Sequence, residues 1–418
     1  MATPSASYEQ IAMLVKSMTN FSATRLETAR EEEQARLADQ KLAELAKQMA
    51  NEGRIKELHD AFIAARNSLD ALPTARASKI VRTLVDACLN AKGQSFNEKE
   101  ALCVESIEWA KGASLLYLSR SLRSRLVRLY NDIGKNVEAS KIAVELAKEL
   151  RKVDDKELSI EVALEESRAA FMLNNFSKAK TALATARTAS HGFYTSATMQ
   201  AQLDLHSGIL YATEDKDYKT AYSYFFEAFE GFVQIGDKER ATQALKYMCL
   251  VKVMLNESDQ IRSLLDSEAC QPYVKEKHIL AMRELAVAFK ERSLARFQKC
   301  LETYPSELND DHVVKGHSSK LHETMLEKEI SRIVEPYAAI DIKHICEKVN
   351  LPLDRIEKKL GMMILDQTLR GVINQQAGCL SIMSPPPSED VYLKASDLVR
   401  ALGKVIDACQ QSSTMLFK

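Results

Sequence analysis

Residues 214–232 read EDKDYKTAYSYFFEAFEGF and hold seven aromatic side chains, in a chain that is only 6% aromatic. Five of the seven follow the steps of 4, 3, 4 and 3 that place side chains on one face of an α-helix: Tyr218, Tyr222, Phe225, Phe229 and Phe232. Ala221 and Ala228 lie beside this stripe and leave room for a neighbouring helix, while Tyr224 and Phe226 widen it. The spacing therefore predicts an aromatic helix face that packs on another helix.

A row of aromatic side chains can also stack on nucleic-acid bases. Such platforms normally come with a basic groove that follows the phosphates. Here Lys216 and Lys219 are outnumbered by the acidic residues at positions 214, 215, 217, 227 and 230. A buried seam between helices is the favoured interpretation, because aromatic stripes usually bury core area.

The composition favours a helical protein without a strong overall charge. A chain of 418 residues is too long for one compact core, so it implies two or more units or a repeat array. Lys and Arg total 57 against 58 Asp and Glu, so no net field attracts nucleic acid or an anionic membrane. Gly and Pro are scarce, at 13 and 9 residues, which favours helices over turn-rich β structure.

The sequence contains no recognisable catalytic, cofactor or metal site. The eight cysteines form no CxxC pair, which argues against zinc and disulfides and fits a reducing compartment. His312, His317 and His322 are five residues apart, so they do not share a helix face, and we interpret them as solvated side chains. Gly-rich phosphate loops, GxSxG elbows and HExxH motifs are absent. We therefore expect no enzyme activity and no cofactor.

Nothing in the sequence suggests export or membrane insertion. The N-terminus, MATPSASYEQIAMLVKSM, lacks a basic segment followed by a long apolar run. No window reaches the roughly 18–20 apolar residues that a membrane span needs. We expect a soluble, intracellular protein.

Most of the chain reads as a series of helices with an internal repeat. Amphipathic segments at 25–50, 53–69, 79–91, 98–110, 121–133 and 137–150 are separated by brief breaks. Three later segments align on Ala139, Ala179 and Ala221, and each has an aromatic residue near the end of the preceding helix: Tyr130, Phe171 and Tyr211. This pattern is typical of stretched tetratricopeptide-like hairpins. It predicts a mostly α fold, with a right-handed α-solenoid over residues 1–304.

The pattern of apolar and polar residues changes after Pro305. Beyond this point the sequence predicts a winged helix at about 321–384. We expect a polar loop over 306–320, a helix at 321–334, a helix at 342–349 with Asp341 as N-cap, and a helix at 353–367. Two β-like runs follow at 371–376 and 379–383. We expect the second run to form an exposed edge strand that pairs with another chain through Leu380 and Ile382.

The second helix of this module does not look like a DNA reader. Its basic residues, Arg355, Lys358 and Lys359, are balanced by Asp354, Glu357 and Asp366. The wing that follows Arg370 has no Lys or Arg. The helix and the wing therefore lack the positive charge whose attraction dominates DNA binding. We favour the interpretation that this surface contacts protein.

The last segment, residues 389–418, predicts one long helix that joins a helical bundle. Apolar residues alternate by 4 and 3 along nearly three heptads: Val391, Ala395, Leu398, Leu402, Val405 and Cys409. A Pro-rich spacer, SPPPS at 384–388, separates this helix from the winged helix. We take Leu398, Leu402, Val405 and Cys409 as candidate contact residues.

Several segments resemble the PCI family of scaffold proteins. LEKEISRIVEPY (326–337), IEKKLGMMILD (356–366) and GVINQQAGCL (371–380) are similar to the winged-helix part of that family. ESIEWAKG (105–112), LKYMCLVKVML (245–255) and residues 214–232 resemble its proteasome-lid members. The resemblance implies a PCI domain over about 220–388, overlapping the last solenoid repeats.

The resemblance also implies a function. Members of this kind are non-catalytic scaffolds whose solenoid contacts the ATPase ring and the α-ring of the core particle. Their winged helices line up edge to edge, and their terminal helices gather in a bundle. Expected partners are other PCI lid subunits, the MPN-domain deubiquitinase subunit, the ATPase ring and the α-ring, in cytoplasm and nucleus. A PCI subunit of the COP9 signalosome and a nucleic-acid-binding winged-helix factor remain the alternatives.

Overall fold

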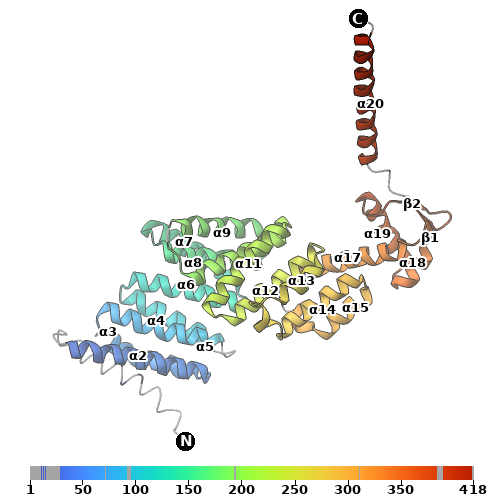
Figure 1. Ribbon diagram of the computed structural model, residues 1–418. Helices are drawn as coiled ribbons and strands as arrows, with labels where there is room; N and C mark the ends of the chain where they lie inside the picture. Colours follow the sequence, from blue (N-terminus) through green and yellow to red (C-terminus); the bar gives the residue numbers. More distant parts are fainter. Residues whose placement is uncertain are drawn as a thin grey trace. The chain divides into compact units, whose positions relative to one another are not determined.

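A computed structural model describes residues 11, 13, 15 and 29–416, except for residues 71, 92–95, 193, 310 and 384–388. In this part of the chain, helices dominate and one small sheet lies near the C-terminus (Figure 1). Two compact units can be distinguished. The first comprises Met1–Leu255 and Leu264–Ile279, and the second comprises Asn256–Ser263 and Leu280–Lys418. The expected solenoid boundary at residue 304 lies inside the second unit.

The first unit is a row of helices joined by short turns. They are α2 (Ala29–Asn51), α3 (Ile55–Asp70), α4 (Thr74–Asn90), α5 (Phe96–Gly112), α6 (Leu116–Ile133), α7 (Asn136–Val153), α8 (Lys156–Met172), α9 (Phe176–His191), α10 (Ala197–Leu210), the π-helix Tyr211–Asp215, α11 (Tyr218–Ile235) and α12 (Lys238–Met254). Consecutive helices contact each other, and so do alternate helices such as α4 with α6 and α6 with α8. This stacking of hairpins is the helical solenoid that the repeat predicted.

Four turns of the solenoid use the same two-residue device. The first residue adopts a left-handed backbone conformation, which ends the helix: Asp154, Asn174, Lys216 and Gly236. The next residue is the N-cap, whose side chain accepts a hydrogen bond from a backbone N–H of the following helix. Asp155 accepts from Leu158 N at 3.3 Å and Asp237 from Arg240 N at 3.2 Å. Local sequence thus sets where each helix starts and stops.

The predicted aromatic stripe of α11 is core over its second half, whereas Tyr218 and Tyr222 at its start are only partly buried. Phe225, Phe229 and Phe232 are buried, and Ala221 and Ala228 are fully buried beside them. The ring of Phe225 lies 5.4 Å from that of Tyr247 in α12, measured between centroids. The stripe therefore forms a seam between helices, and most of its aromatic surface is not available for stacking on bases.

The same seam explains a glycine in α10. A Cβ atom added at Gly208 would lie 2.7 Å from two ring carbons of Phe225, which is too close for a carbon contact. Only a residue without a side chain permits this approach of α10 to α11. Phe226 points elsewhere and is 39% exposed, so only Tyr224 widens the packed face as expected: its ring stacks on Tyr211 at 5.4 Å.

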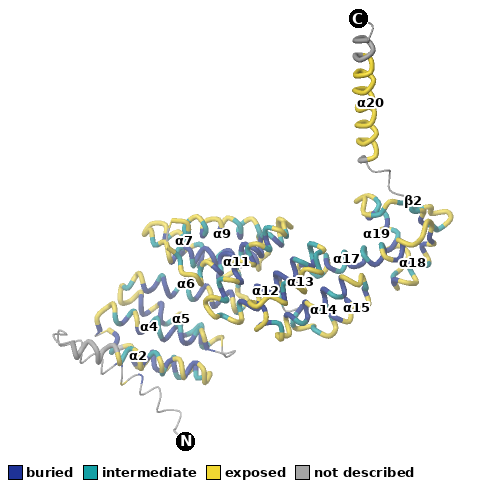
Figure 2. Tube along the Cα trace, viewed as in Figure 1, coloured by how far each residue is buried: buried dark blue, intermediate teal, exposed yellow. Residues whose placement is uncertain are grey.

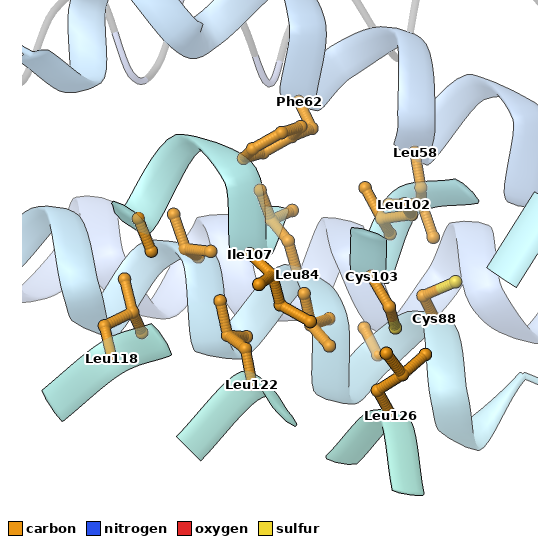
Figure 3. Packing of buried hydrophobic residues seen from close by; sticks show 14 of the residues in the cluster. Leu58, Phe62, Leu84, Cys88, Leu102, Cys103, Ile107, Leu118, Leu122 and Leu126 are labelled. Atoms are coloured by element: carbon orange, nitrogen blue, oxygen red, sulfur yellow. The ribbon is translucent and has the colours of Figure 1, made fainter. Parts of the chain in front are cut away.

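The N-terminal helices share one apolar core (Figure 3). Side chains of α3, α4, α5 and α6 converge there, among them Leu58, Leu84, Leu102 and Leu122, and all four are buried. At its edge Trp109 packs on Phe62 and donates a 2.8 Å hydrogen bond from Nε1 to Asp70 Oδ1. The same core extends to side chains of α2, α7 and α8, so it joins helices that a periodicity argument alone treats separately.

After α12 the chain continues through short helices and one long helix; of these elements the 3-10 turn belongs to the first unit and the others lie wholly or mostly in the second. The elements that follow α12 are α13 (Ser258–Leu265), the 3-10 turn Gln271–Tyr273, α14 (Lys277–Glu291), α15 (Leu294–Thr303), α16 (Pro305–Asn309), α17 (His312–Val334), β1 (Ala339–Asp341), α18 (Ile342–Val349), α19 (Leu353–Leu365), β2 (Gly371–Asn374), β3 (Cys379–Ile382) and α20 (Glu389–Leu416). Contacts of α17 with α15, α16 and α18 make it the common support of the short helices and the winged helix.

The prediction of a polar loop over 306–320 is wrong. Residues 305–309 form α16, and α17 begins at His312 because the Asp311 side chain accepts a hydrogen bond from Val313 N at 3.0 Å. The polar residues of this segment occupy the outer side of a helix that buries Val313 and Val314. His317 is buried on the same helix, so the expectation that it is solvated is also wrong.

The winged helix is present, but its sheet differs from the prediction. The sheet has three strands in the order β1–β3–β2, because the short strand at Ala339–Asp341, missed from the sequence, pairs with β3. Leu380 lies opposite both Ile340 and Ile373 and is fully buried. Leu380 and Ile382 are therefore not on an edge strand. Asp341 does occupy the N-cap position of α18, without a side-chain capping bond.

The α11 seam yields a first prediction. Phe225→Ala should destabilise the protein by roughly 3–5 kcal/mol, because it removes a buried aromatic side chain and leaves a cavity. Phe226→Ala, on the exposed neighbour, should change stability by about 0.5 kcal/mol or less. Thermal and urea unfolding of the two variants would check this. Equal melting of Phe225→Ala and wild type would contradict the packing.

A second prediction concerns the contact between Gly208 and Phe225. Gly208→Ala should be destabilising in the wild-type protein, since the new methyl group meets the Phe225 ring. In a Phe225→Ala background the ring is gone, so the same substitution should cost much less. A double-mutant cycle on unfolding free energies measures this coupling, which we expect to reach about 1 kcal/mol or more. Additive effects would show that the two residues do not interact.

Candidate protein-interaction surfaces

The terminal helix α20 exposes the predicted seam. Leu398, Leu402 and Val405 are 73%, 61% and 60% exposed, and Cys409 is also exposed. Every described residue from 391 to 410 is exposed (Figure 2). Large apolar side chains in water are unfavourable by roughly 1.5–3 kcal/mol each relative to burial. The helix thus presents an apolar stripe that the described part of this chain does not cover.

The stripe is wider than the sequence analysis indicated. Tyr392, Val399 and Ile406 are also more than half exposed and follow one another at intervals of seven. This interval places them in one row beside the predicted seam. The seven-residue repeat of these three residues is visible in the sequence and is the signal that could have predicted this second row. With two adjacent rows, α20 can contact more than one partner helix.

The wing offers strand edges other than the one predicted. Among the described residues, β1 and β2 each pair only with β3, so their outer sides are available to another strand. Val372 on β2 is half exposed. Gly371 lies against β3, where a Cβ would be 2.8 Å from the Ser381 carbonyl oxygen. Any edge-to-edge contact of this sheet must therefore use β1 or β2.

The outer face of α19 is mixed rather than basic. Lys359 Nζ forms an ion pair with Glu327 Oε1 at 2.8 Å. The exposed basic residues of α19 are then Arg355 and Lys358. Leu365 and Met362 are exposed on the same helix. Apolar and charged side chains side by side favour a protein partner over a phosphate backbone.

Among the described residues, no group of three or more His, Cys, Asp and Glu side chains is arranged to hold a metal ion. Burial raises the pKa of the Cys88 thiol to about 11 and that of Cys103 to about 12, so both stay protonated and unreactive near neutral pH. Burial, with a smaller contribution from the positive charges of Arg168 and Arg240, lowers the pKa of His206 to about 3.

No helix among the described residues combines the length and the apolar character that a membrane crossing requires.

Comparison with known proteins matches both ends of the chain. The PCI domain family matches residues 301–384, and the family described as the 26S proteasome regulatory subunit RPN6 N-terminal domain matches residues 3–133. The PCI match covers the winged helix and the end of the short helices, in the C-terminal half of the 220–388 range that we expect for this domain. The resemblance read from the sequence is thereby confirmed.

Individual relatives match along most of the chain. A protein named probable 26S proteasome regulatory subunit rpn-6.2 from Caenorhabditis briggsae is 45% identical over 87% of this chain and 89% of its own. The 26S proteasome non-ATPase regulatory subunit 11 homolog of Arabidopsis thaliana is 39% identical over 90% and 89%. The probable rpn6 subunit of Schizosaccharomyces pombe is 35% identical over 97% and 94%. The chain belongs to the Rpn6 family of 26S proteasome regulatory subunits, also called non-ATPase regulatory subunit 11.

Proposed function

We propose that this chain is a non-catalytic scaffold subunit of the lid of the proteasome regulatory particle. Its solenoid contacts the ATPase ring and the α-ring of the core particle, and its C-terminal parts join the other PCI lid subunits and the MPN-domain deubiquitinase subunit. In this position it is needed for assembly and for ATP-dependent degradation of ubiquitinated proteins, in cytoplasm and nucleus.

The observation that carries this proposal is the wide apolar stripe of α20. A helix that exposes two rows of large aliphatic side chains is unfavourable in water unless other chains cover it. The family is one of subunits of a large particle, so other subunits are the natural cover. Membership in this family also argues against the signalosome alternative, and the mixed charge of α19 argues against DNA binding.

The stripe gives a third prediction. Leu398→Asp combined with Leu402→Asp should leave the isolated chain folded, because both side chains are exposed in it. The same variant should fail to enter the particle, since it places two charges in an apolar interface. Helicity, melting temperature and incorporation into purified regulatory particles would be measured on one preparation.

The matched control for this variant lies on the other side of α20. Arg400→Gln with Lys404→Gln lowers the net charge by the same two units on the face opposite both apolar rows. This control should both fold and assemble. Normal assembly of the Leu398 and Leu402 variant would exclude α20 as the docking element, and unfolding of that variant alone would indicate that α20 packs within its own chain.

A fourth prediction follows from the scattered titratable groups. The purified chain should hydrolyse neither fluorogenic peptides nor ubiquitin conjugates. Its removal from the particle should reduce degradation of ubiquitinated substrates while the peptidase activity of the free core is retained. Hydrolysis by the isolated chain that a point mutation abolishes would contradict the scaffold role. Tight binding of duplex DNA that weakens steeply with salt would favour the nucleic-acid alternative.

A further inference from the structure

An open groove lies in the first unit. It has a volume of about 610 Å³ and is lined by α4 between Thr74 and Asp86 and by residues 114–118, where α6 begins. We call it the α4–α6 groove. Thr74, Ser78 and Arg82 follow one another at intervals of four, so they form one continuous side of α4 along its wall.

The opposite wall of the α4–α6 groove is apolar and exposed. Leu116 and Tyr117 are adjacent residues, 63% and 56% exposed, at the start of α6. Most large apolar residues of this solenoid lie between helices, whereas these two line a surface depression. Exposed apolar residues that gather in a depression are typical of a binding surface.

One positive charge in the α4–α6 groove has no counter-ion. Lys79 Nζ lies 3.0 Å from Asp39 Oδ2, and Arg125 donates to Asp86 at 3.1 Å, so these groove charges are compensated. Arg82 stacks on the Tyr117 ring, with its guanidinium carbon 4.9 Å from the ring centroid. Among the described residues, Arg82 makes no ion pair, and its buried Nε has no hydrogen-bond partner.

The chemistry of Arg82 indicates which chemical group would pair with it. A guanidinium offers parallel N–H donors that match the two oxygens of a carboxylate, and a donor left unsatisfied in a buried position is costly. The stacked Tyr117 ring holds the guanidinium in place and so reduces the entropy lost on binding. A carboxylate placed over Arg82 would lie beside the apolar surface of Leu116.

We infer that the α4–α6 groove binds a segment of a neighbouring subunit in which an Asp or Glu side chain stands within two residues of a large aliphatic one. The carboxylate pairs with Arg82, and the aliphatic side chain covers Leu116 and Tyr117. A phosphate ion would leave both apolar residues exposed, and a nucleic-acid backbone needs several unpaired cations rather than one. The inference rests on the proposed function, because it requires a subunit beside this face of the solenoid.

Crosslinking within the assembled particle identifies the occupant. Leu116 would be replaced by the photo-reactive amino acid p-benzoylphenylalanine, the full-length chain assembled with the other subunits, and the crosslinked peptides sequenced by mass spectrometry. We expect one crosslinked segment that contains an acidic residue within two positions of Leu, Ile, Val or Met. Assembly without a crosslink, a crosslink to a segment without that pair, or a crosslink to a chain terminus alone would overturn the inference.

Charge reversal tests the role of Arg82 itself. Arg82→Glu should weaken binding of the full-length chain to particles that lack it by tenfold or more. The control, Arg76→Glu, makes the same change on α4 outside the groove lining and should bind like wild type. Both variants should stay folded, and Arg82→Glu should lose only the stacking on the exposed Tyr117 ring, which contributes little to stability. Exchanging the crosslinked acidic residue for Arg should restore binding of Arg82→Glu.

The outcomes separate the two proposals. If the wild-type chain does not enter the particle at all, the proposed scaffold function fails. If the wild-type chain enters and Arg82→Glu enters with equal affinity, only the groove inference fails. Equal weakening by Arg82→Glu and Arg76→Glu also overturns it, since the effect would then follow net charge and not this groove.

Discussion

The solenoid depends on the close approach of helices at positions that carry little or no side chain. At Gly208 a methyl group would lie 2.7 Å from the Phe225 ring, and at Gly231 it would lie 2.9 Å from the Ala201 methyl. Fully buried alanines hold the start of the second helix in three hairpins: Ala139, Ala179 and Ala221. Because every such seam joins only neighbouring helices, the stability of the stack is a sum of local contacts. Loss of one seam therefore weakens its own hairpins most.

In a helical stack of this kind the interior is filled by packing contacts, so any binding function must use the outer surface. Its buried thiols are protonated, and the described His, Cys, Asp and Glu residues do not converge on a metal site. What differs from one hairpin to the next is the outer side, where Leu116, Tyr117 and Arg82 gather in one depression. The second unit likewise combines a packed winged helix with an apolar helix in solvent. Each unit thus combines a packed interior with exposed apolar side chains, which fits the proposed scaffold role.

Features that follow from the local spacing of residue types could be predicted from the sequence. Features formed by residues that are far apart in the sequence could not. The α11 stripe and the hairpin repeat follow local spacing, so both were found before the structure was known. The strand at Ala339–Asp341 is only three residues long and exists because β3 pairs with it, so no periodicity marks it. That strand changes β3 from an edge to the centre of the sheet. Arg82 and Tyr117 are 35 positions apart, and only the packing of α4 beside α6 brings them together.

The width of the α20 stripe bears on the kind of partner that can cover it. A two-stranded coiled coil buries two positions in each heptad, and its neighbouring positions are usually charged. In α20 the neighbouring row holds Tyr392, Val399 and Ile406, so three positions in each heptad are apolar. A single partner helix would leave that third row in water. At least two partner helices are therefore needed to cover the stripe. If α20 joins a bundle of terminal helices as proposed, it becomes fully buried only when more than one neighbouring subunit is in place, which would tie its burial to a late stage of assembly.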